Sequence, residues 1–108
     1  MSIVKQGYHG WEATTQIDLQ DGYALRILTM KRHGGMLVTT ASRVKLEEGG
    51  GFSHFPMDDF SQVIISRKVR VTSGAVQLQH DNALEQVSEI KARMVAFYAS
   101  KEKELATA

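Results

Sequence analysis

Residues 23–46 read YALRILTMKRHGGMLVTTASRVKL, and this stretch decides the fold. It consists of two strand-like runs on either side of Gly34-Gly35. A Gly-Gly pair is a strong two-residue hairpin loop, because both central positions of a type I′ turn need a positive φ. The stretch therefore predicts a β-hairpin in which His33 lies opposite Met36.

This register gives the hairpin two different faces, because side chains alternate along a strand. The first face is mostly apolar, and its pairs are Tyr23 with Leu46, Leu25 with Val44, Ile27 with Ser42 and Thr29 with Thr40. The second face is mixed and basic, with Arg26 opposite Arg43. A like-charge pair across two strands costs stability, so this pair is the unusual feature of the hairpin.

The flanking sequence extends the hairpin into a meander. Trp11 to Leu19 alternates between apolar and polar residues, as a half-buried strand does. A three-residue loop at 20–22 places Gly22 in the left-handed position and sets Ile17 opposite Leu25. A turn at Gly49-Gly50 leads to a short edge strand that sets Leu46 opposite Ser53 and contains Pro56. We expect four antiparallel strands at about 11–19, 23–33, 36–47 and 52–57.

The rest of the chain changes character towards the C-terminus. Residues 1–10 show no period and predict an irregular lead-in. Residues 61–72 favour an irregular connection with a short helical piece, although a fifth strand continuing through Val69 and Val71 also fits. From Thr72 onward, apolar residues recur at steps of three and four, which predicts one long helix over about 73–104, capped by Thr72 or Ser73. A helix that starts at Asn82, after a strand over 75–80, is the alternative.

Length and composition set the bounds. A chain of 108 residues predicts a single α+β domain over 1–108. It contains no cysteine, which excludes disulfides and thiol chemistry. It has neither a membrane-spanning apolar run nor a signal-peptide core, so we expect a cytoplasmic protein without membrane contact. A helix of this length exceeds the sheet and predicts a homodimer.

The charge is unevenly distributed. The net charge of +1 results from −2 over residues 1–22, +4 over 23–72 and −1 over 73–108. The central sheet is therefore the basic part of the chain. An ordinary solvated sheet face would also explain this distribution.

No catalytic or metal motif stands out. The four histidines lack metal-ligand spacing, and we expect no metal and no cofactor. His54 with Asp58 or Asp59 could form an acid–base pair, so a small enzyme centred on these residues is one alternative. Gly49-Gly50-Gly51 lacks the Lys and Ser/Thr of a phosphate-binding loop.

The basic sheet face is the strongest functional indication. Arginines that gather despite their repulsion suggest an anionic ligand. We therefore predict a non-enzymatic protein that binds nucleic acid or another anionic partner. The predicted binding residues are Arg26, Arg32, Arg43, Lys45 and His54. The alternative is a protein-interaction or inhibitor-type accessory protein that uses Leu28, Met30 and Leu37 or the end of the helix.

The predicted order, four antiparallel strands followed by a helix, is similar in topology to Whirly-type and coactivator-type single-strand nucleic-acid binders. Those proteins assemble through their helices. The resemblance implies an α+β fold and a nucleic-acid partner, and it assigns no residue of this chain to a role.

Overall fold

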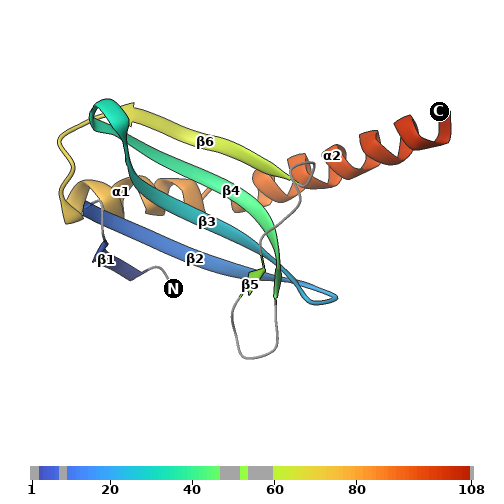
Figure 1. Cartoon of the computed structure of the whole chain (residues 1–108), viewed down its shortest axis with the longest axis horizontal. Coiled ribbons are helices and arrows are strands. Elements are labelled where there is room, and N and C mark those ends of the chain that lie inside the picture. The colour runs from blue at the N-terminus through green and yellow to red at the C-terminus, as the bar shows by residue number, and fades with distance from the viewer. Residues whose placement is uncertain (1–2, 8–9, 47–51, 54–59, 108) are drawn as a thin grey trace.

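The computed structural model describes residues 3–7, 10–46, 52–53 and 60–107. Within these ranges one antiparallel sheet of six strands is covered on one face by helices (Figure 1). The predicted α+β class with a β-meander is confirmed. The strands are β1 (Ile3–Gly7), β2 (Gly10–Gln20), β3 (Tyr23–Arg32), β4 (Met36–Leu46), β5 (Phe52–Ser53) and β6 (Ser61–Lys68). The helices are the 3-10 turn η1 (His33–Gly35), α1 (Ser73–Leu84) and α2 (Val87–Thr107).

Three predicted segments differ from the structure. The N-terminal segment is not wholly irregular, because Ile3–Gly7 pairs with β2 as strand β1. Residues 61–72 begin with strand β6, which pairs with β4 and takes the place predicted for 52–57. Of that predicted strand, only β5 lies within the described residues, and Leu46 is opposite Phe52 instead of Ser53. The predictions for residues 47 and 54–57 lie outside the described residues.

The β2–β3 register is as predicted over most of its length. Ile17 lies opposite Leu25 and Thr15 opposite Ile27, and Gly22 has the expected positive φ of 80°. A bulge near the turn sets Gln20, instead of Leu19, opposite Tyr23. The connection therefore has two residues, Asp21 and Gly22, instead of the predicted three, and the same side chains of β2 still face the core.

The predicted β3–β4 register is wrong by one residue. The loop consists of His33, Gly34 and Gly35, so Arg32 lies opposite Met36. Both glycines do have positive φ, 73° and 74°, but His33 joins them in the loop. A one-residue shift turns every side chain of one strand to the other face. Leu37, Thr39 and Ala41 consequently face the helices; all three are fully buried.

The single long helix predicted over 73–104 is two helices. Thr72 caps α1 as predicted, because its Oγ1 accepts a hydrogen bond from Ala75 N at 3.1 Å. The chain then leaves the α-helical pattern at 85–86, where Gln86 N donates to Ala83 O, three residues back. Neither residue is Gly or Pro, so no helix-breaking residue signals this interruption. Figure 1 shows α1 against the sheet and α2 extending beyond it.

The core contains a polar layer between two apolar clusters. Leu25, Ile27 and Ala41 belong to the larger cluster, with Phe60, Ala83 and Ile90. Ala13, Leu37 and Val76 form the smaller one. On β2, β4 and α1 the polar residues lie between members of the two clusters, and on β3 Thr29 follows the larger cluster. These polar residues are Thr15, Thr29, Thr39, Gln79 and His80.

Hydrogen bonds join this polar layer across three strands and α1. The His80 ring lies 2.8 Å from Thr15 Oγ1 through Nε2 and 2.8 Å from Thr29 Oγ1 through Nδ1. Thr29 Oγ1 is 2.6 Å from Thr39 Oγ1. Gln79 Nε2 donates to Thr39 Oγ1 at 3.1 Å and to Leu37 O at 2.9 Å.

Counting protons assigns the tautomer of His80. Thr39 Oγ1 accepts a hydrogen bond from Gln79, so we assign the Thr39 hydroxyl proton to a hydrogen bond with Thr29 Oγ1. Thr29 then donates its own hydroxyl proton to His80 Nδ1. His80 Nε2–H donates to Thr15. This leaves only the hydroxyl proton of Thr15, which is 9% exposed, without an acceptor in the layer. In the opposite tautomer, the hydroxyl proton of the fully buried Thr39 would have no acceptor. That costs more free energy than leaving the partly exposed hydroxyl of Thr15 without one.

We expect Gly34→Ala to lower the free energy of unfolding by about 1 kcal/mol, because a Cβ is strained at positive φ. Space is not the reason, since no atom lies within 4 Å of a Cβ built there. Gly74→Ala is the matched control: Gly74 lies in α1, so alanine should stabilise the protein by about 0.5–1 kcal/mol. Urea denaturation measures both, and equal effects would contradict the assigned loop.

We also expect stability to fall when the pH drops below the ordinary histidine pKa of 6.5, because burial lowers the pKa of His80 despite the nearby Asp81 carboxylate. The unfolded state then binds more protons than the folded state, so the free energy of unfolding decreases with acidification. Urea denaturation between pH 7.5 and about 5 should show this decrease. The decrease in the free energy of unfolding should be smaller in His80→Gln and should persist in His33→Gln. If stability falls with pH as steeply in His80→Gln as in the unmodified protein, the prediction is wrong.

Candidate anion-binding site

The structure does not form the predicted basic face. Arg26 and Arg43 do not lie opposite each other: Arg26 is opposite Ser42, and Arg43 is opposite Leu25. The one-residue shift in β4 places the two arginines on opposite faces of the sheet. The pair that motivated the predicted site is therefore absent.

Arg43 lies on the face covered by helices. Its guanidinium carbon is 4.2 Å from the ring centre of Tyr23 and 4.3 Å from that of Tyr98. Such cation–π contacts contribute about 0.5–1 kcal/mol each when partly exposed. Tyr98 Oη also accepts a hydrogen bond from Phe60 N at 3.1 Å. Arg43 thus connects α2 to the sheet and does not lie on the opposite face. We call that opposite face the open face; it carries Arg26, Leu28 and Met30 of β3, while at one end of it Ala24 and Val44 are fully buried.

The other predicted residues are dispersed. Lys45 is exposed and pairs with Tyr23 at the end of β4 that is remote from the loop. His54, Asp58 and Asp59 lie outside the described residues. The apolar alternative is also divided, because Leu28 and Met30 are half-buried on the open face whereas Leu37 is buried under the helices.

Arg26 remains on the open face, near the middle of the sheet. Its neighbours across the strands are Gln16 and Ser42. Burial lowers the pKa of its guanidinium, and the charge of Glu12 on β2 opposes that shift. Arg26 is therefore half-buried beside a carboxylate, an environment that suits a structural role as well as a binding role.

A different basic cluster forms at the end of the sheet that carries the β3–β4 loop. On the helix side, Lys31 and Arg67 flank Leu37; on the open side, Arg32 and Lys68 flank Met36. Two strand spacings separate the members of each pair, or about 10 Å. We define the basic end as these cations together with one more in the following connection to α1. Its residues are Lys31, Arg32, Arg67, Lys68 and Arg70.

The five side chains of the basic end are all exposed, and none forms an ion pair with another described residue. The sequence contains no Asp or Glu over 22–46 or over 60–80. By contrast, Arg93 on α2 is 2.8 Å from Glu89. Unpaired cations at one end of a sheet produce a local positive potential that attracts anions.

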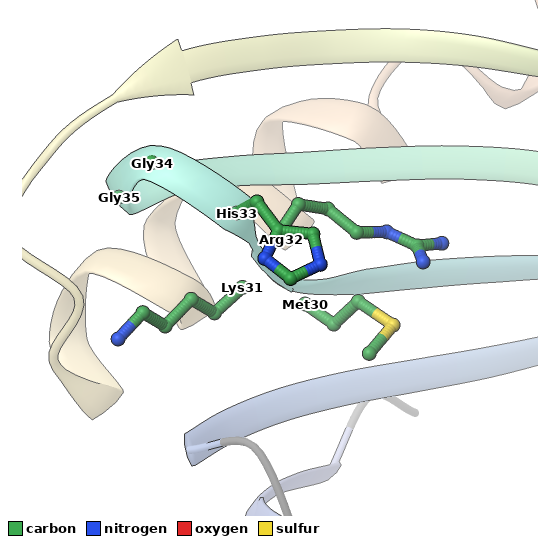
Figure 2. A pocket seen from close by; sticks show the side chains of 6 residues that line it. All are labelled: Met30, Lys31, Arg32, His33, Gly34 and Gly35. Carbon is green, nitrogen blue, oxygen red and sulfur yellow. The ribbon is translucent and has the colours of Figure 1, made fainter.

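The loop at this end is concave. Met30, Lys31, Arg32, His33, Gly34 and Gly35 line an open depression of about 470 Å³. Figure 2 shows the side chain of Lys31 directed away from those of Arg32 and Met30, with His33 between them. A ligand at the loop would therefore meet positive charge on both sides of β3.

Other chemistry has little support in the described residues. They contain no group of three His, Asp or Glu side chains that could hold a metal ion. His80 is fully buried between threonines, so no substrate reaches it. None of the described helices is long and apolar enough to span a membrane.

Of these five cations, the sequence predicts only Arg32 as a binding residue. Lys31 is expected on the apolar face of the hairpin. Arg67, Lys68 and Arg70 lie in the stretch over 61–72 for which an irregular connection is favoured, so the sequence does not place them beside Lys31 and Arg32. One signal was available, because the stretch over 60–80 lacks any acidic residue. Treating Val63, Ile65 and Arg67 as alternate positions of a strand would have brought these cations to the sheet.

Comparison of the chain with models of protein families, with curated proteins and with solved structures produced no match. The interpretation of the basic end therefore depends on its own residues.

Proposed function

We propose that this protein binds nucleic acid through the basic end, by contacts with backbone phosphates. The observation that supports this is the clustering of five exposed cations from β3, β6 and the connection to α1, none of which forms an ion pair with another described residue. Lys and Arg supply most of the affinity for nucleic acid by neutralising phosphates. The role first assigned to a basic sheet face moves to the end of that sheet.

The open face itself suits base recognition poorly. Single-strand binders combine a positive groove with aromatic side chains on which bases stack. The open-face positions of β2, β3, β4 and β6 carry no aromatic residue, and β5 adds a single one, Phe52, in register with Leu46. We therefore propose electrostatic binding with little sequence preference.

We expect Lys31→Ala, Arg67→Ala and Lys68→Ala each to weaken binding to an oligonucleotide and to reduce the slope of log K against log salt by about 1. Each substitution removes one cation that displaces counterions. Fluorescence anisotropy of a labelled oligonucleotide at several salt concentrations measures both quantities.

Lys45→Ala is the matched control, because Lys45 is an exposed cation of the same sheet at its other end. Its affinity and salt slope should equal those of the unmodified protein. If Lys45→Ala weakens binding as much as Lys31→Ala does, the charge of the whole protein accounts for binding and the basic end is not the site.

A homodimer remains a prediction, now supported by exposed apolar side chains on the helices. Val95 on α2 is 64% exposed and Leu78 on α1 is 58% exposed. We expect sedimentation equilibrium to give twice the chain mass, and Val95→Glu to shift the protein towards monomer because it places a charge in the contact. A monomer at all concentrations would refute this prediction.

A further inference from the structure

Building on the proposed function, we propose that the β3–β4 loop is the place where a single phosphate group is held. The group would sit in the depression at His33–Gly35, beside the side chain of Arg32. The remaining cations of the basic end would then contact neighbouring phosphates of the same molecule. The loop would then be a fixed contact point for one phosphate, whereas the rest of the basic end attracts phosphates by charge alone.

The loop backbone is partly accessible, since Gly34 is exposed and Gly35 is half-buried. Both have positive φ, and a Cβ built on either would have no atom within 4 Å apart from those of the adjacent residues. Backbone N–H groups in turns of this kind form concavities that bind anions, and the absence of side chains at two successive residues lets an anion approach closely.

The surrounding charges favour phosphate over carboxylate. Lys31 and Arg32 project to opposite faces of β3 (Figure 2), so only one of them can reach a group held on either face. On the Arg32 side, a tetrahedral phosphate offers oxygens to the guanidinium and to the loop backbone, whereas a planar carboxylate is satisfied by one arginine fork from one side. The guanidinium of Arg32 can also bind two phosphate oxygens at once.

The positions of the other cations fit a ligand with several phosphates. Lys68 lies two strands from Arg32 on the open side, and Arg67 lies two strands from Lys31 on the helix side. The Cα atoms of each pair are about 10 Å apart, so their long side chains can reach one phosphate between them or two adjacent ones. The row of cations is therefore suited to a ligand that carries several phosphates.

The amide signals of Gly34 and Gly35 in two-dimensional NMR spectra test this proposal. The titrants are inorganic phosphate, a short oligonucleotide and polyglutamate at matched ionic strength. We expect the oligonucleotide to shift both glycine amides in a saturable manner and polyglutamate to leave them in place. Shifts with inorganic phosphate as well would assign the site to phosphate in general; shifts with the oligonucleotide alone would assign it to the nucleic-acid backbone.

Variants that conserve charge distinguish a phosphate held at a defined position from general electrostatic attraction to the basic end. Arg32→Lys keeps the charge but loses the two-pronged contact, so affinity for the oligonucleotide should fall about fivefold with the salt slope unchanged. Arg67→Lys is the matched control and should bind as the unmodified protein does. Equal affinities in the two variants would overturn the proposal.

The two proposals can fail separately. If the oligonucleotide shifts the amides of Arg67, Lys68 and Arg70 but not those of Gly34 and Gly35, the loop position is wrong and nucleic-acid binding stands. If polyglutamate shifts the glycine amides as strongly as the oligonucleotide does, the phosphate preference is wrong. If no oligonucleotide binds, the proposed function fails together with this inference.

Discussion

The hydrogen bonds of His80 within the core are the constraint on which the rest of the structure depends. One imidazole ring connects Thr15 on β2 to Thr29 on β3, and Thr29 in turn contacts Thr39 on β4. Each polar atom buried here would cost about 1–3 kcal/mol if it lost its partner. Apolar side chains can still pack when one strand shifts along its neighbour, whereas these hydrogen bonds form in only one register of the strands. The polar layer therefore makes the alignment of three strands specific.

That alignment also determines the basic end. Two residues beyond Thr29 and two residues before Thr39, the side chains on the same face are Lys31 and Leu37, and Arg67 on β6 completes the row. Moving β4 by one residue would carry β6 with it and break both cation rows. The buried threonines and the exposed cations thus belong to one geometric solution, although no hydrogen bond joins them directly.

The sequence allowed the α+β class, the hairpin, the β2–β3 register and the Thr72 cap to be predicted, because each has a local signal. It could not settle the β4 register, since either alignment turns a similar number of apolar residues inward: Leu37 and Ala41 in one, Val38 and Val44 in the other. The choice depends on hydrogen bonds between Thr29, Thr39 and Gln79, which are distant in sequence. Two of the five cations of the basic end lie in the predicted hairpin, and the other three required the pairing of β6.

The position of β6 has a consequence for solubility. Among the described strands β6 pairs only with β4, so it is an edge strand of the described sheet. Edge strands can pair with a strand from another molecule. Proteins limit such pairing with bulges and with charges on the edge strand. β6 has both, a bulge opposite Thr39 and Thr40 and the cations Arg67 and Lys68 at its end. The same charges thus oppose the pairing of β6 with a strand of another molecule, so replacing Arg67 or Lys68 would affect solubility as well as the proposed binding.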